Sequence, residues 1–247
     1  MRELRELREL QGLASGWLRR TLRRYRKGMT DPLSLFPLAL AASGGRLDGI
    51  ECQQLVAAGL TLLRRSAPLV RALSGRRSGI LVPNVPALIV ALAASDGRGA
   101  VVFEPASTAA DLEWQLSDAN VGAVFTTNDL ATRLPGDMPL VLLDDAPRFA
   151  QVRIEGNRRD IDLGSHVGLE LEGSLDAEGL DEECVVVYGS ASPHPSVLTH
   201  RQLIAHAGGA PNETLAGIAP GSPLHDLLSL TRSSRSSRVG PPPAVRG

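Results

Sequence analysis

The sequence is poor in cysteine: its 247 residues include only Cys52 and Cys184, which lie far apart along the chain. This spacing excludes a disulfide scaffold, a CxxC redox pair and a cysteine-based zinc site, and it is typical of a reducing compartment. The longest apolar run, residues 80–94, is interrupted by prolines and is shorter than the roughly 20 residues that span a bilayer. The first residues, MRELRELREL, do not resemble a secretory signal. We therefore expect a cytoplasmic protein without a transmembrane helix.

An excess of charge of one sign is also absent, since 26 basic residues face 27 acidic ones and the formal net charge is -1. This balance provides no global field that would attract nucleic acid, so we expect no nucleic-acid partner. Several catalytic motifs are missing as well, namely GxSxG, HExxH, GxGxxG and a complete GxxxxGKS or GxxxxGKT. No two of the five histidines have the i, i+4 spacing that places both on one helix face. We predict no metal site.

From residue 30 onward the sequence alternates regularly between short apolar runs and amphipathic segments. The apolar runs predict buried strands at residues 78–82, 99–103, 121–126, 139–143 and 184–188. The amphipathic segments predict helices at residues 51–73, 86–94, 108–118 and 200–207. We expect Pro68 to bend or divide the first helix, and Thr108 and Thr199 to cap the third and the fourth. This order predicts an α/β fold with a mostly parallel sheet flanked by helices.

Between residues 144 and 183 the sequence is acidic, rich in glycine and weakly periodic. It contains two short candidate strands, residues 152–154 and 166–171. We expect loops here, with a small hairpin at the edge of the sheet.

The two ends of the chain differ in composition from the domain between them, which we place at residues 30–228. Residues 1–29 repeat the triplet Arg-Glu-Leu and are rich in arginine, which predicts a basic amphipathic helix. Residues 1–28 are suited to a peripheral contact with a membrane or a protein partner, but also to a solvated helix that docks on nothing. Residues 229–247 combine arginine, serine and three consecutive prolines without an acidic residue, which predicts a disordered tail.

The loop that follows residues 184–188 is the candidate functional site. Gly189, Ser190, Ser192 and Ser196 supply backbone N–H groups and hydroxyls that can surround a phosphate, because consecutive free amides form an anion-binding concavity. Polar loops without a ligand have the same composition, and these residues alone do not decide between the two interpretations.

The order of the motifs from residue 79 to residue 126 carries more information than any one of them. They are Val-Pro-Asn at residues 82–84, Pro86, Gly-Ala-Val-Val at residues 99–102, Pro105, a segment with two leucines and one glutamate at residues 111–116, and Phe-Thr at residues 125–126. This order resembles the N-terminal region of the adenylate-forming (AMP-binding) superfamily, which includes acyl-CoA synthetases, adenylation domains of peptide synthetases and luciferases. The likeness covers roughly residues 45–210, and it implies an incomplete N-terminal subdomain of the adenylate-forming fold.

The phosphate loop of that family reads Tyr-Thr-Ser-Gly-Thr-Thr-Gly-x-Pro-Lys-Gly-Val and is soon followed by Thr-His. In this chain Tyr188, Ser190, Thr199 and His200 match the pattern, and Ser192 stands in place of a threonine. The resemblance therefore implies that Ser190, Ser192, Thr199 and His200 bind nucleotide.

The loop also departs from the family pattern. Ala191 occupies the position of a glycine, and the lysine is missing, since the chain has no lysine after Lys27. The family's ribose-binding aspartate and its lysine-bearing C-terminal lid lie beyond the matched region, so we expect a truncated relative and assign no catalytic residue.

The resemblance implies ATP and Mg²⁺ as cofactors, a carboxylic acid as the substrate, and CoA or a carrier-protein thiol as the acceptor of the acyl group. Two interpretations remain open. One is an AMP-dependent ligase-like protein that is inactive as this fragment, and the other is a non-catalytic module that binds nucleotide or docks on a partner.

Overall fold

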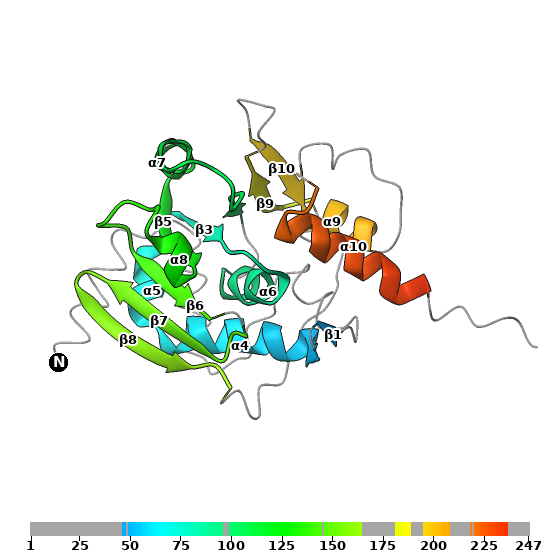
Figure 1. The fold of residues 1–247 in the computed structure, drawn as a ribbon, viewed down its shortest axis with the longest axis horizontal. Helices are drawn as coiled ribbons and strands as arrows, with labels where there is room; N and C mark the ends of the chain where they lie inside the picture. The colour runs from blue at the N-terminus through cyan, green and yellow to red at the C-terminus, as the bar shows by residue number, and fades with distance from the viewer. Residues whose placement is uncertain are drawn as a thin grey trace, which may run out of the picture.

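The computed structural model describes residues 46–47, 49–95, 99–144, 146–164, 181–188, 195–207, 218 and 220–236. An eight-stranded sheet lies at its centre, in the order β10-β9-β4-β3-β5-β6-β7-β8 (Figure 1). Five neighbouring strands run parallel, and they are β9 (Glu183–Val187), β4 (Ala100–Val102), β3 (Arg77–Leu81), β5 (Val121–Thr126) and β6 (Leu140–Leu143). The antiparallel strands lie outside them, with β10 (Ser196–Thr199) at one edge and β7 (Phe149–Ile154) and β8 (Asn157–Asp162) at the other. The predicted mostly parallel α/β sheet is confirmed.

Helices cover both faces of this sheet. One face carries α4 (Cys52–Arg65), α5 (Ala67–Ala72), α6 (Val85–Ala94), α9 (His200–Ala207) and α10 (Pro223–Ser236), and the other carries α7 (Ala109–Asp118) and α8 (Asn128–Ala131). Successive strand residues serve opposite faces, as expected for a pleated strand. Ile80 belongs to the core beneath α6, whereas its neighbour Leu81 belongs to the core beneath α7.

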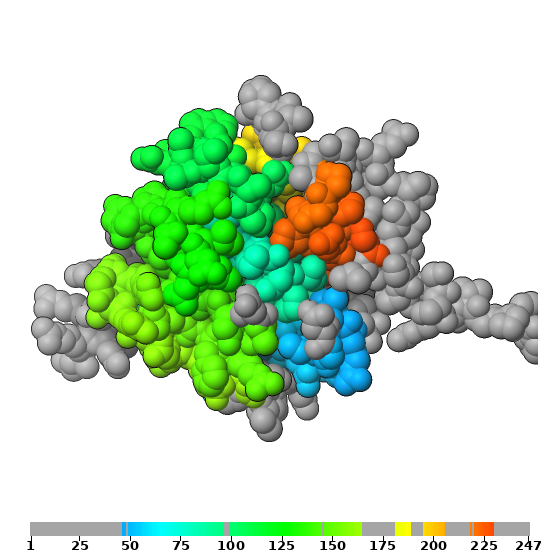
Figure 2. All heavy atoms as spheres, in the orientation of Figure 1, coloured from blue at the N-terminus to red at the C-terminus, as the bar shows by residue number. Residues whose placement is uncertain are grey.

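Helix α6 is the centre of the larger core. All ten of its residues are buried, and its first turn is capped by the side chain of Asn84, which accepts a hydrogen bond of 2.9 Å from the backbone of Ala87. Helix α4 approaches α6 closely at Gly59, where an added Cβ would lie 2.6 Å from the Cβ of Ala93. At the surface, α10 lies beside α6 (Figure 2).

Local sequence explains how helix α4 begins and where it ends. A short hairpin of β1 (Arg46–Leu47) and β2 (Ile50–Glu51) turns at Gly49, whose φ of 82° is the left-handed conformation that glycine tolerates best. The predicted helix over residues 51–73 is divided at Ser66, with Pro68 in the first turn of α5. The predicted division of this helix is therefore confirmed.

The edge hairpin differs from the sequence-based expectation. Its first strand, β7, contains the predicted residues 152–154, but its second strand is β8, a segment of sequence NRRDID that the apolar pattern does not reveal. Five of the six β8 residues are exposed, because an edge strand needs to bury little apolar surface. The other candidate strand, residues 166–171, lies outside the described residues.

Further elements were not expected from the sequence, among them the strands β1, β2 and β10 and the helices α8 and α10. Helix α8 follows β5 directly, and α10 extends to Ser236, beyond residue 229 where we placed the start of a disordered tail. Residues 237–247 and the predicted N-terminal helix, residues 1–29, lie outside the described residues. Within the described part of the chain, no helix combines the length and the apolar character that crossing a membrane requires.

Candidate functional site

The predicted phosphate loop connects two adjacent strands at one edge of the sheet. Strand β9 is followed by Tyr188, and β10 begins at Ser196, which pairs with Val187 in the antiparallel register. Both ends of the loop therefore lie at the carboxyl ends of the parallel strands, where open α/β sheets bind their ligands. Ser190 and Ser192 belong to residues 189–194, which lie outside the described residues.

Thr199 and His200 lie at the opposite end of the same hairpin. Thr199 pairs with Glu183, the first residue of β9, and lies three strand residues beyond Ser196 at the end of the loop, a distance of about 10 Å. Its hydroxyl accepts a hydrogen bond of 3.3 Å from the backbone of Gln202, and its own amide donates to the side chain of Gln202 at 2.8 Å. This capping box confirms Thr199 as the N-cap of α9.

His200 is 2% exposed, and its backbone amide donates to the carbonyl of Glu182 at 3.2 Å. The structure thus places Thr199 and His200 together at the start of α9, away from the point where the chain enters the loop. Nucleotide binding by Ser190, Ser192, Thr199 and His200 stays a prediction.

Tyr188, which also matches the family pattern, contacts three side chains from other parts of the chain. Its hydroxyl donates a hydrogen bond of 2.6 Å to Oδ2 of Asp118. Its ring stacks on Phe103 with a centroid distance of 6.4 Å and meets Trp114 edge-on at 5.7 Å. Burial raises the pKa of Tyr188 well above its usual range, and the hydrogen bond to Asp118 raises it further, so the phenol loses its proton only at a pH above that at which a free tyrosine ionises.

Sequence reasoning missed Asp118, Trp114 and Phe103 as partners of Tyr188. Asp118 precedes Tyr188 by 70 positions, and no local periodicity links an acidic residue at the end of a helix to a tyrosine that follows a strand. The only available signal was the expected parallel packing of the strands that end at Phe103 and Tyr188.

Two other polar groups lie near the same carboxyl edge. Oγ1 of Thr126, the last residue of β5, and Oε1 of Glu104, which follows β4 closely, are buried without a hydrogen-bond partner among the described residues. Leaving a buried polar atom without a partner costs about 1–3 kcal/mol. This edge therefore contains polar atoms that packing alone does not satisfy.

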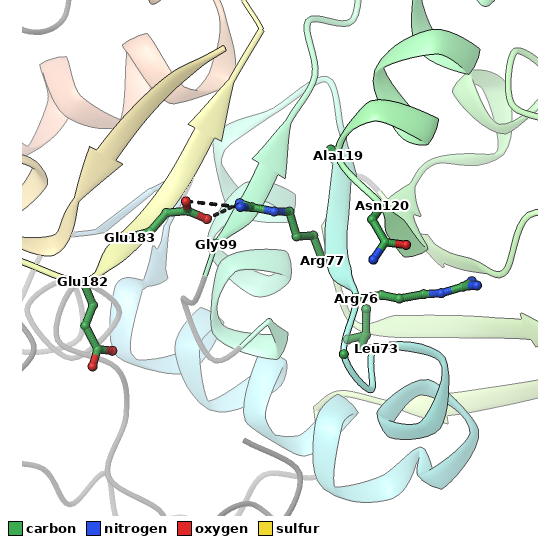
Figure 3. A pocket seen from close by; sticks show the side chains of 9 residues that line it. Leu73, Arg76, Arg77, Gly99, Ala119, Asn120, Glu182 and Glu183 are labelled. Atoms are coloured by element: carbon green, nitrogen blue, oxygen red, sulfur yellow. Dashed lines mark hydrogen bonds and ion pairs between the residues drawn. The ribbon is translucent and has the colours of Figure 1, made fainter. Parts of the chain in front are cut away.

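The amino ends of the parallel strands border a cavity of about 400 Å³ (Figure 3). Its lining residues are Leu73, Gly75, Arg76, Arg77, Gly99, Ala119, Asn120, Glu182 and Glu183. Arg77 and Glu183 form a two-point ion pair inside it, whose Nη2–Oε2 distance is 3.2 Å, and Arg76 points away from this pair (Figure 3). The cavity contains two arginines and two glutamates, so its lining charges balance.

The described residues show no further reactive centre. They include no group of three or more His, Cys, Asp or Glu side chains that could hold a metal ion. Cys52 and Cys184 are both buried and free of disulfide bonds, and burial raises the pKa of Cys184 far above its usual range. Because the thiolate is the reactive form, Cys184 is not suited to act as a nucleophile.

Comparisons with known proteins agree with this architecture. No family model matches the chain. The chain is 31% identical over 178 residues to 4-coumarate--CoA ligase-like 4 from Oryza sativa subsp. japonica, a match that covers 67% of this chain and 31% of the relative. The chain thus spans about a third of the length of that relative.

Among solved structures, a nonribosomal peptide synthetase in its α-methyl-L-serine-AMP bound form matches with a TM-score of 0.52 and 16% identity, over 86% of this chain and 25% of that one. An amide bond synthetase from Marinactinospora thermotolerans matches with a TM-score of 0.50 and 14% identity, over 82% of this chain and 42% of that one. At these identities the likeness shows a shared fold.

Proposed function

Because this chain is related in sequence and in fold to the N-terminal part of adenylate-forming enzymes, we propose that it binds the phosphates of MgATP at the loop between β9 and β10. The observation that carries the proposal is the position of that loop. Tyr188 and Ser196 fix its two ends at the carboxyl edge of the parallel strands, where ligands of open α/β sheets bind. Ser190 and Ser192 then supply hydroxyl donors to the phosphate oxygens.

The resemblance implies a two-step reaction for a complete relative. A carboxylate oxygen attacks the α-phosphorus of ATP, which forms an acyl adenylate and releases pyrophosphate. The thiol of CoA or of a carrier protein then attacks the acyl carbon and releases AMP. In this chain we assign to the loop the binding of phosphate that precedes the first step.

The composition of the loop favours binding over catalysis. The chain has no lysine after Lys27, and Pro193 and Pro195 provide no amide hydrogen. A preorganised donor that faces the developing charge is worth on the order of a few hundred-fold in rate. We therefore propose that this chain binds MgATP and forms adenylate slowly or not at all.

Mg²⁺ would reach this site together with the nucleotide. The described residues offer no cluster of carboxylates for it, and Mg²⁺ in nucleotide sites is commonly held by the phosphates together with only one or two carboxylates. A carboxylic acid as the substrate and a thiol as the acyl acceptor are part of the same proposal, and only the resemblance supports them.

Calorimetric titration with MgATP tests the proposal. Replacing Ser190 and Ser192 together by alanine is expected to weaken binding about tenfold or more, because hydrogen bonds to charged oxygens are lost. The matched control is Ser117→Ala, an exposed serine on α7, which is expected to bind as the original chain does. No binding by the original chain, or equal binding by all three proteins, would contradict the proposal.

The non-catalytic docking interpretation rests on residues 1–28, which lie outside the described residues. It remains a prediction from their basic amphipathic pattern.

A further inference from the structure

Tyr188 is fixed on three sides immediately before the chain enters the proposed phosphate loop. Phe103 directly follows β4, and Trp114 and Asp118 both come from α7. Tyr188 is 4% exposed, so its ring has little freedom, and its hydroxyl has a definite partner in Asp118. The first residue after β9 is thus tied to a helix as well as to the neighbouring strands.

Helix α7 is itself held firmly in place. Thr108 and Asp111 form a capping box at its start, in which the amide of Asp111 donates to the hydroxyl of Thr108 at 3.1 Å. Leu112 and Leu116 are buried against the sheet. A carboxylate on this helix therefore has a fixed position, and a binding site keeps its geometry only if the residues that support it are fixed in this way.

Asp118 occupies an unfavourable position for helix stability. It is the last residue of α7, where the helix dipole places partial negative charge, and the last turn contains no basic residue. A carboxylate there raises the energy of the helix unless another contact compensates, and the hydrogen bond from Tyr188 is such a contact. Burial and this hydrogen bond both keep the phenol in its donor form.

We propose that Asp118 is a positioning residue for nucleotide binding. By holding the hydroxyl of Tyr188, it fixes the point at which the chain leaves β9 and enters the phosphate loop. The inference rests on the proposed function, because it assigns the loop to MgATP. Asp118 touches no phosphate in this account and acts through the hydroxyl of Tyr188.

The test compares Asp118→Ala with Glu113→Ala, which removes an exposed carboxylate from the same helix. Asp118→Ala is expected to weaken MgATP binding about tenfold, as is Tyr188→Phe, whereas Glu113→Ala is expected to leave binding unchanged. Asp118→Asn keeps an acceptor oxygen and is expected to recover part of the loss. The double variant of Asp118→Ala and Tyr188→Phe is expected to bind no worse than either single variant, because both remove the same hydrogen bond.

Thermal melts separate positioning from a merely structural role. Removing an acid from the end of a helix relieves repulsion with the dipole, so Asp118→Ala is expected to melt within about 2 °C of Glu113→Ala. Weaker binding at equal melting temperature supports the proposal. Equal binding by Asp118→Ala and Glu113→Ala overturns it, as does a fall in binding that follows the loss of stability.

Hydrogen exchange without nucleotide distinguishes failure of this inference from failure of the proposed function. Asp118→Ala is expected to speed exchange at the amides of Tyr188 and the residues that follow it, relative to Glu113→Ala. If the original chain binds no MgATP, the proposed function fails, and unchanged exchange at these amides would then overturn the positioning role as well.

Discussion

Arg77 and Glu183 form an ion pair that crosses the amino end of β4 and joins β3 to β9. The pair passes directly over Gly99, whose amide donates to the backbone carbonyl of Glu183 at 3.1 Å. A Cβ at Gly99 would lie 2.5 Å from Oε1 of Glu183 and 3.3 Å from Nη1 of Arg77. Because Gly99 has no side chain, it leaves room for the ion pair that connects β3 to β9 across β4.

Replacing Gly99 by alanine is expected to lower the free energy of unfolding by about 1–3 kcal/mol. The residue has a φ of 58°, which strains any residue with a Cβ, and the new methyl group would also displace the carboxylate. Urea denaturation measures the change. Gly136→Ala is the matched control, since a Cβ there meets no atom within 4 Å. An equal effect at both positions would contradict this account of Gly99.

Thr126→Val is expected to stabilise the protein by about 1 kcal/mol. Thr126 is fully buried, and its hydroxyl has no hydrogen-bond partner among the described residues, so a methyl group of similar shape removes an unsatisfied atom. Thr61→Val is the control, because the hydroxyl of Thr61 donates to the carbonyl of Ala57 at 2.9 Å and is already satisfied. Stabilisation that is absent at Thr126, or equal at both positions, would show that the hydroxyl has a partner in solution.

Spectroscopic titration of tyrosine tests the environment of Tyr188. The chain has two tyrosines, Tyr25 and Tyr188, and the pKa of Tyr188 is raised by burial and by Asp118. One tyrosine is therefore expected to ionise well above the usual value of about 10, and Tyr188→Phe is expected to remove that late step.

The sign of the linked stability follows from the same shift. Since the pKa of Tyr188 is raised in the folded state, its contribution to stability is complete below the unfolded value of about 10 and is lost as the pH rises through the folded value. Ionisation of both tyrosines in a single step near pH 10, in protein that is still folded, would be inconsistent with the burial of the Tyr188 ring and its hydrogen bond to Asp118.

Much of the fold could be predicted from the sequence, because the strands at the centre of the sheet are short apolar runs. The predicted residues 121–126 coincide with β5, and the caps Thr108 and Thr199 begin α7 and α9 as expected. Central strands are buried on both faces, so their composition alone identifies them. Helix caps are equally local signals.

The elements and contacts that were missed depend on tertiary context. β8 is polar because it lies at the edge of the sheet, and the arginines and serines of α10 gave no apolar pattern. The ion pair of Arg77 with Glu183 joins residues 106 positions apart. Only the strand order brings such side chains together, and spacing along the sequence does not contain that order.

Introducing a lysine next to the loop tests whether the lack of a lysine weakens MgATP binding at the proposed site. Ser196 follows Pro195 at the start of β10, next to the loop, and Ser196→Lys is expected to strengthen MgATP binding about tenfold through a charged hydrogen bond to phosphate. Val197→Lys is the control, because successive side chains of a strand point to opposite faces and Val197 is exposed. An equal gain from both lysines would indicate a general effect of charge and not a defined contact.

The central claim is that this chain binds MgATP, and a thermal melt with and without saturating MgATP tests it most directly. A ligand at 100 times its dissociation constant stabilises the folded state by about 2.7 kcal/mol, which raises the melting temperature of a domain of this size by roughly 5 to 10 °C. We expect a cooperative transition that moves upward by several degrees with MgATP and does not move with Mg²⁺ alone. A transition that MgATP leaves in place would contradict the claim and would mean that the likeness to adenylate-forming enzymes records descent without nucleotide binding.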